Sequence, residues 1–396
     1  MLEFYSASTR MVNPRHAIDE CVTVAAGGQP LQASLAIIHA SIGHNLLELS
    51  RQVRAHYPDA RVVGTSCAGV IGVEGVSETL KDVAIMLVSG NEFAVAHVDG
   101  VSGASSFECG KQLAENLRAQ KSGINMIYLL GPGIDIANDR LMAGIESVMG
   151  EEVTIFGATS SDNMRGVRTF QVVDDAMFEH AAYAVGFADP SLFVNTMATH
   201  GFVAVNQPMT VTKARGNKIL ELDGKPAWKV YTATMSLPET ATPADTIPIG
   251  ALAEELTPER AAIYHNQHIL RVVTHLDENG AMIYATDIAE GTKLWLTVRD
   301  EELIFSDMER MVNEMQTLAH GKKPIAVFQA DCLARGRRLF NRIIKEELVQ
   351  KMQHAFAADD VLPPWLGMYG FGEYARLGSK NEYHNYTTAL AAIYRK

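Results

Sequence analysis

The chain has 396 residues, of which 47% are hydrophobic and 20% charged, a composition typical of folded globular proteins. Lysine and arginine total 34 against 46 aspartate and glutamate residues, so the formal net charge is −12 and the positive charge that nucleic-acid backbones require is missing. No apolar run approaches the roughly 20 residues of a membrane helix, and the first residues do not resemble a secretory signal. We therefore expect a cytoplasmic protein that binds neither nucleic acid nor membrane.

The four cysteines stand far apart and form no Cys-x-x-Cys pair. This spacing disfavours a disulfide framework, a zinc ribbon, an iron–sulfur cluster and covalently attached haem. We expect reduced thiols at Cys21, Cys67, Cys109 and Cys332.

In chain order, a unit of strand, helix, returning strand and strand pair recurs. The hydrophobic pattern predicts it twice in full and a third time more loosely. The first copy covers residues 35–39, 44–56, 61–65, 83–88 and 93–97, the second covers 125–130, 138–149, 153–157, 169–173 and 181–187, and the third covers 324–328, 337–354 and 365–372.

Each copy carries glycine close to the end of the returning strand. Because glycine permits positive φ and close backbone approach, these positions predict either a turn beneath a cleft or simply a tight exit from the strand.

A different region separates the second and third copies. Residues 216–226 predict a short strand and an Asp-Gly turn, and a proline starts the helix predicted at 227–234. Residues 236–248 are rich in proline and threonine, which indicates an irregular connector, and more strands and a helix follow up to residue 320. We therefore predict an α/β protein of two mixed α/β domains, 1–215 and 216–396, built from repeated strand-helix-strand-strand units with glycine turns after the returning strand.

Cys67 and Gly69 follow the first returning strand, where a thiol nucleophile could meet the backbone donors of a turn. No histidine or aspartate partner can be assigned from spacing, and the Gly-x-Ser-x-Gly pattern is absent. A buried small thiol is therefore the favoured interpretation. An enzyme that depends on Cys67 is the alternative, and we expect no catalysis.

The thirteen histidines do not show the spacing of a metal site. His-Glu-x-x-His is absent, and on a strand His265 and His268 would point to opposite faces. A single axial haem ligand is different, because one imidazole in an apolar pocket needs no spacing pattern.

Two further segments could bind a small ligand. Arg335, Arg337 and Arg338 follow a predicted strand at the start of a predicted helix, where guanidinium groups and free N–H donors could bind an anion or the arginines could pair with acidic neighbours. Near the C-terminus, a polar and aromatic run predicts either a polar pocket or a hydrogen-bonded hairpin. Its donors and acceptors are Glu373, His384, Asn385 and Thr387.

Five segments in this order carry a family resemblance: VVGTSCAGVI (62–71), IFGATSSD (155–162), LELDGKPA (220–227), VFQADCLARG (327–336), and GFGE (370–373) with HNYT (384–387). Together they resemble the FIST family of intracellular signal-transduction proteins, with a FIST N-like domain at 1–215 and a FIST C-like domain at 216–396. The resemblance implies a sensory, ligand-binding role coupled to a histidine kinase or a cyclic-di-GMP enzyme. Some stand-alone bacterial members are haem proteins that sense nitric oxide and inhibit a partner histidine kinase.

We therefore expect a bacterial cytoplasmic sensor, most concretely one in which b-type haem senses nitric oxide and regulates a histidine kinase. The candidate haem ligands are, in order, His384, His268 and His200. The alternative is an amino-acid or small-metabolite sensor without haem, in which Arg335 binds a carboxylate and Glu373 or Asn385 binds an amine. A scaffold without ligand is the third expectation, and the chain could form a homodimer.

Overall fold

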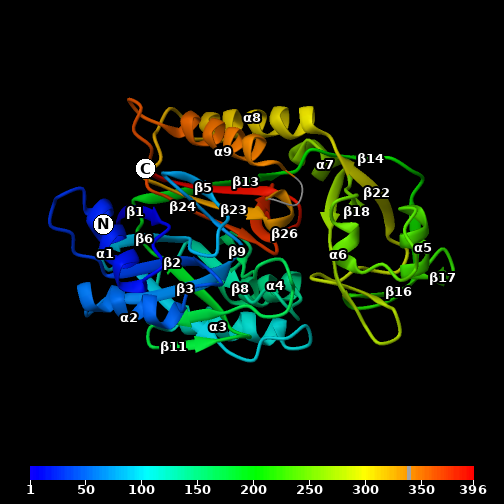
Figure 1. Ribbon diagram of the computed structural model, residues 1–396, viewed down its shortest axis with the longest axis horizontal. Coiled ribbons are helices and arrows are strands. Elements are labelled where there is room, and N and C mark those ends of the chain that lie inside the picture. Colours follow the sequence, from blue (N-terminus) through cyan, green and yellow to red (C-terminus); the bar gives the residue numbers. More distant parts are fainter. Residues whose placement is uncertain (337–339) are drawn as a thin grey trace.

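The computed structural model describes residues 1–336 and 340–396. Within these ranges, three six-stranded sheets form one body, and a nine-stranded sheet forms a separate unit beside it (Figure 1). We call these parts the three-sheet body and the inserted unit, which covers residues 202–299. The α/β class predicted from the sequence is confirmed.

The three sheets of the body share one strand arrangement. In each, the two middle strands are parallel and every other neighbouring pair is antiparallel. In spatial order the first sheet holds β1 (Glu3–Thr9), β6 (Val83–Ser89), β2 (Leu35–Ser41), β3 (Arg61–Cys67), β10 (Gln171–Val173) and β11 (Ala176–Phe178). The second holds β7 (Phe93–Val98), β12 (Ala182–Phe187), β8 (Met126–Gly131), β9 (Thr154–Thr159), β25 (Glu373–Leu377) and β26 (Lys380–His384). The third holds β13 (Leu192–Thr199), β27 (Thr388–Arg395), β23 (Ala326–Cys332), β24 (Trp365–Gly370), β4 (Val70–Gly72) and β5 (Gly75–Ser77).

Helices make the crossovers that parallel strands require. The parallel strands of each sheet are joined by α2 (Leu46–His56), α4 (Asn138–Met149) and α9 (Arg342–Phe356). A second helix precedes each first parallel strand: α1 (Pro14–Ala26), α3 (Ser106–Gln120) and α8 (Glu301–Leu318). The two helices of each copy pack against one another. The strand, helix and returning strand of each predicted unit are thus confirmed. The strands predicted as a pair at 83–88 and 93–97 are not paired with each other, because β6 lies in the first sheet and β7 in the second.

The copies exchange their hairpins. The β4–β5 hairpin of the first copy completes the third sheet, and the β10–β11 hairpin of the second copy completes the first sheet. The β25–β26 hairpin of the third copy completes the second sheet. The exchange closes a cycle, so each copy supplies two edge strands to another and none has a complete sheet of its own.

The arrangement of the sheets does not follow the predicted division of the chain near residue 215. β13 pairs with β27 over eight residues, from Leu192 opposite Arg395 to Thr199 opposite Thr388. Residues 324–336 and 340–396 therefore lie in the three-sheet body with the residues before 200. The predicted boundary near residue 215 separates strands that share a sheet, because the third copy is interrupted by the inserted unit.

The inserted unit has its own curled sheet and its own hydrophobic core. The path of strands begins with β19 and ends with β20, which follow one another in the chain with only Val272 between them. Its elements are β14 (Phe202–Ala204), β15 (Met209–Arg215), β16 (Lys218–Leu222), β17 (Lys225–Pro226), α5 (Ala227–Thr234), α6 (Pro243–Thr246), β18 (Ala251–Glu255), α7 (Pro258–Tyr264), β19 (His268–Arg271), β20 (Val273–Leu276), β21 (Met282–Tyr284) and β22 (Lys293–Arg299).

The chain enters and leaves the inserted unit at adjacent points. β14 pairs with β22, with Phe202 opposite Arg299, and the Asp300 amide donates to the Gly201 carbonyl at 3.0 Å. This pair of segments is a two-stranded stem, and α8 begins directly after it. Among the described residues, no helix has the length and apolar character needed to cross a membrane.

Gly157 is required by close packing inside the second sheet. Its φ is 133°, and a Cβ atom there would lie 2.1 Å from the Leu129 carbonyl oxygen. We expect Gly157→Ala to lower the free energy of unfolding by more than about 2 kcal/mol, since the clash adds to the backbone strain. Urea unfolding measures this change. Gly150→Ala is the control, because that glycine also has positive φ but an added Cβ would meet no atom within 4 Å. Equal losses in the two variants would contradict the close approach.

Candidate functional site

The turns that follow the three returning strands meet at the centre of the body. The Ser161 hydroxyl donates to the Tyr369 carbonyl at 2.6 Å and accepts from the Ala68 amide at 2.9 Å. The Ser66 hydroxyl donates to the Ser161 carbonyl at 2.9 Å. All four residues are buried. The turns therefore form a closed polar junction and leave no open cleft between them.

Cys67 and Gly69 belong to this closed region. The Cys67 thiol packs in the core of the body, and burial raises its pKa well above the usual value. Such a thiol is protonated at neutral pH and out of reach of a substrate. At Gly69, an added Cβ would lie 2.5 Å from the Ser77 carbonyl oxygen, so this glycine allows close packing of β5.

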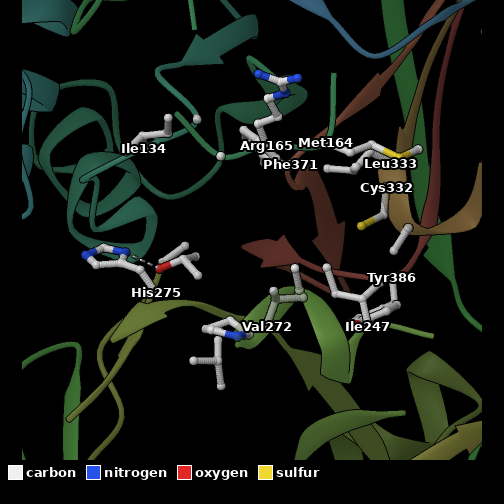
Figure 2. A pocket seen from close by; sticks show the side chains of 18 of the residues that line it. Ile134, Met164, Arg165, Ile247, Val272, His275, Cys332, Leu333, Phe371 and Tyr386 are labelled. Atoms are coloured by element: carbon white, nitrogen blue, oxygen red, sulfur yellow. Dashed lines mark hydrogen bonds between the residues drawn. The ribbon is translucent and has the colours of Figure 1, made fainter. Parts of the chain in front are cut away.

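A cavity of about 120 Å³ lies between the body and the inserted unit (Figure 2). We call it the junction pocket. Its body side comes from the segments that follow β8, β9, β23 and β24, where ligands commonly bind in α/β sheets. The lining residues are Gly133, Ile134, Asp135, Met164, Arg165, Gly166, Cys332, Leu333, Ala334, Phe371, Tyr383 and Tyr386 from the body, and Pro243, Ala244, Ile247, Val272, Val273, Thr274, His275 and Ala285 from the inserted unit.

The pocket has an apolar, buried floor and a polar rim. Cys332, Leu333 and Ala334 form part of the floor, and the Cys332 sulfur points toward the open centre (Figure 2). Burial raises the pKa of this thiol well above its usual value, so the Cys332 sulfur is an uncharged part of the pocket floor. Arg165 and His275 are exposed at the rim. The arrangement suits a ligand with an apolar part and a polar end.

The rim histidine is neutral. The His275 Nδ1 atom lies 3.0 Å from the Thr274 hydroxyl, and burial lowers the pKa of the imidazole. The neighbouring body loop is fixed by Asp162, whose carboxylate accepts from the backbone amides of residues 165–168. This buried aspartate holds Met164 and Arg165 at the pocket.

Buried polar contacts attach the inserted unit to the body beside the pocket. Arg271 forms ion pairs with Glu254 at 2.5 Å and Glu382 at 3.4 Å, and it donates to the Tyr383 carbonyl at 2.8 Å. Burial works against the charged form of Arg271, but these carboxylates outweigh it and raise its pKa. Since Tyr383 and Val272 line the pocket, this attachment sets its width.

Asn385, a predicted ligand residue, also positions the pocket wall. Its side-chain oxygen accepts from the Val272 amide at 3.3 Å, and its side-chain nitrogen donates to the Phe371 carbonyl at 3.2 Å. Asn385 is buried, and it joins a wall residue of the inserted unit to one of the body.

The three candidate haem ligands lie outside the lining of the junction pocket. The His200 Nε2 atom donates to the His268 carbonyl at 3.0 Å, and its Nδ1 atom accepts from the Phe202 amide at 2.9 Å. Burial lowers the pKa of His200 to about 3. The ring of His268 packs edge-on against Trp295, with centroids 5.5 Å apart.

His384 is fully buried, and its Nδ1 atom lies 3.3 Å from the Tyr264 hydroxyl. Burial lowers the pKa of its imidazole to about 4. Its Nε2 atom has no hydrogen-bond partner in the described part of the chain. This nitrogen could ligate a metal only if a cavity opened beside it.

The junction pocket does not fit the predicted b-type haem. Pockets for cofactors and drug-sized ligands span about 300–1,000 Å³, whereas the junction pocket encloses about 120 Å³ and lacks the three candidate histidines. Within residues 1–336 and 340–396, no group of three or more His, Cys, Asp or Glu side chains could hold a metal ion.

Arg335 and Glu373 form a buried polar layer behind the floor. Arg335 lies in a 3₁₀ turn, Leu333–Arg335, and not at the start of α9, which Asn341 caps. Its Nη1 atom donates to the His200 carbonyl at 3.2 Å, while Nε and Nη2 have no hydrogen-bond partner in the described residues. Arg337 and Arg338, also predicted to bind an anion, lie outside the described residues.

The Glu373 carboxyl is fully buried near this arginine. Its Oε2 atom accepts from the Thr387 hydroxyl at 2.6 Å, and burial raises its pKa well above the usual range. Neither Arg335 nor Glu373 lines the junction pocket. The structure thus brings Arg335, Glu373, Asn385, His200 and His384 to one side of the pocket, beneath its floor or wall, and leaves Cys67 and Gly69 in the core.

Sequence reasoning missed most of the residues that line the pocket. The inserted unit contributes Ile247 and Val272, which lie in or beside segments interpreted as a connector and a strand. One signal was available, because the polar loop after the second returning strand begins with a buried aspartate at Asp162 and leads to Arg165. Nothing in the chain order indicates that residues 243–275 face this loop.

Comparisons with known proteins agree with the sequence segments described above. A model of the FIST N domain matches residues 34–225, and a model of the FIST C domain matches residues 227–376. An uncharacterised protein of Mycobacterium tuberculosis is 23% identical over 375 residues, covering 92% of both chains. One of Methanocaldococcus jannaschii is 22% identical over 365 residues, covering 86% of this chain and 66% of its own. A cyanuric acid hydrolase from A. caulinodans covers 100% of this chain and 99% of its own at 9% identity, but the TM-score of 0.36 supports no conclusion.

The burial of the His200 imidazole predicts sensitivity to acid. Below the usual pKa of 6.5 the unfolded chain binds a proton that the native ring does not take up until about pH 3, so native stability falls as pH drops through this interval. We expect His200→Gln, which cannot titrate, to lose about 1 kcal/mol less per pH unit than the wild type between pH 6 and 4.5. Urea unfolding across this range measures the difference. Parallel curves for the two proteins would contradict a neutral, buried His200.

The attachment at Arg271 predicts a strong effect on stability. Arg271→Gln leaves the partly buried Glu254 carboxylate without its cation and leaves Glu382 with Arg260 alone, and we expect a loss of about 3 kcal/mol. Arg260→Gln is the matched control, because Arg260 pairs with the same Glu382 but is more exposed, and we expect a loss below about 1 kcal/mol. Chemical unfolding measures both variants. Similar small losses would show that the attachment does not depend on Arg271.

Proposed function

Because the chain belongs to the FIST family, we propose that it is a sensor that binds one small metabolite in the junction pocket and signals to a separate protein. FIST domains are sensor domains of signal transduction that bind small ligands. The observation that carries the proposal is a cavity with an apolar floor whose walls come from both parts of the molecule. The proposal assigns no catalytic step to this chain.

The size of the pocket supports a small ligand. An engineered apolar cavity of about 150 Å³ binds benzene. The junction pocket, at about 120 Å³, therefore suits a hydrocarbon group of similar or smaller size. The side chain of a branched amino acid or another short metabolite meets this limit. This supports the amino-acid or small-metabolite form of the sensor over the haem and nitric oxide form, for which the geometry offers no support.

Binding between two units can drive a signal. A ligand that contacts both walls favours the arrangement in which they are close, and only this difference in affinity can shift the population. The two-stranded stem joins the inserted unit directly to α8, which packs against α9 on the outside of the body (Figure 1). We infer that α8 passes the change to a cytoplasmic partner. The family resemblance favours a histidine kinase or a cyclic-di-GMP enzyme, and a homodimer would be compatible with this role.

Filling the pocket tests this proposal. Val272 is a half-buried wall residue, and we expect Val272→Trp to occupy the cavity and abolish the thermal stabilisation that a bound ligand gives. A thermal-shift screen of amino acids and short metabolites, followed by calorimetry, measures binding. Val205→Trp is the control, because Val205 is exposed on the inserted unit and outside the pocket.

Two outcomes would oppose the proposal. One is a ligand that binds both tryptophan variants with unchanged affinity. The other is purified protein with an intense Soret band at one haem per chain, which would favour the haem-based nitric oxide sensor instead.

A further inference from the structure

The rim of the junction pocket carries one unengaged positive charge. Three side chains at the rim can carry a charge, namely Asp135, Arg165 and His275. The Asp135 carboxylate accepts from the Gly103 amide at 3.3 Å, and His275 is neutral beside Thr274. For the Arg165 guanidinium, no ion pair or hydrogen bond is found in the described part of the chain.

Arg165 has no ion-pair partner in the described residues although the chain has an excess of acids. Aspartate and glutamate outnumber lysine and arginine by 46 to 34. Arg168, three residues later on the same loop, pairs with Glu179 and lies over the ring of Phe170. The Asp162 carboxylate binds the amides of both arginines, so the loop holds Arg165 at the pocket and Arg168 outside it.

The other walls define what such a charge could bind. Leu333, Ala334 and Phe371 give the floor and side an apolar character, and the buried Glu373 carboxyl behind them does not line the cavity. A guanidinium group binds carboxylates through paired N–H donors. The combination therefore matches a ligand with a short hydrocarbon part and an anionic end.

We propose that the ligand of the junction pocket is a small apolar carboxylate and that Arg165 is the residue that selects for its charge. This inference rests on the proposed function, because it names the ligand class of the same pocket. In Figure 2 the Arg165 side chain extends away from the apolar lining at the upper edge of the pocket. Binding then requires this side chain to turn over the mouth, where it closes the cavity above the hydrocarbon part.

The test compares an acid with its uncharged counterpart. Calorimetry with 3-methylbutanoate and 3-methylbutanamide separates the charge from the hydrocarbon group, which is the same in both. We expect the acid to bind wild-type protein about tenfold more tightly, since a charge-assisted hydrogen bond at an exposed rim contributes about that factor. Raising the salt concentration should weaken binding of the acid and leave the amide unchanged.

Two arginine variants assign the effect to one residue. We expect Arg165→Gln to bind acid and amide with equal affinity, and Arg168→Gln to keep the tenfold preference. Thermal unfolding without ligand checks that both variants are folded. Valine serves as a third probe, because it differs from 3-methylbutanoate only by its ammonium group. A requirement for that group would show as binding of valine but not of 3-methylbutanoate.

The outcomes separate this inference from the proposed function. Equal binding of acid and amide to the wild type, or an unchanged preference in Arg165→Gln, overturns the role of Arg165 while Val272→Trp still reports on the pocket. Binding of valine alone overturns the apolar carboxylate without an ammonium group and leaves the amino-acid sensor. Failure of all three probes overturns the ligand class, and the wider screen against Val272→Trp then decides the proposed function by itself.

Discussion

The exchange of hairpins among the three sheets is the constraint on which the rest of the structure depends. Because β4–β5, β10–β11 and β25–β26 each complete the sheet of another copy, the sheets must assemble together. The returning strands then end at one central place, where Ser66, Ser161 and Tyr369 bond to each other through hydroxyl and carbonyl groups. These hydrogen bonds pair the buried hydroxyl and carbonyl groups where the turns meet.

The junction pocket lies where the repeat is broken. The third copy carries the inserted unit between β13 and α8, and this unit packs against segments that follow strands of the second and third copies. Arg271 carries much of that packing, because it satisfies two carboxylates and a carbonyl beside the pocket wall. An asymmetric addition thus supplies one wall of the junction pocket.

The sequence predicted the repeated unit well and the site only in part. Buried strands such as Leu35–Ser41 could be predicted, because every residue except His39 is apolar or small. Only a short helix separates this strand from the next one in the chain. The hairpin exchange and the return of residues 324–336 and 340–396 to the body could not be predicted, since strand pairing across such distances leaves no local pattern. The ligand candidates were chosen as polar residues near glycine, but in the structure they are buried and make internal contacts. Asn385 joins two walls of the junction pocket, and both ring nitrogens of His200 form hydrogen bonds with backbone groups. Arg165 was overlooked because it stands in a loop without periodicity.

The two-stranded stem has a consequence for how such a protein can change. Its ends lie side by side, with the Asp300 amide bound to the Gly201 carbonyl, so the body needs only this short junction to continue from β13 into α8. Segments that leave and re-enter at neighbouring points can be lengthened, shortened or replaced with little effect on the host fold. The inserted unit is therefore a part of the fold that can be exchanged as a whole. Recombination at the stem could exchange the pocket walls that the inserted unit supplies, while the three-sheet body stays the same.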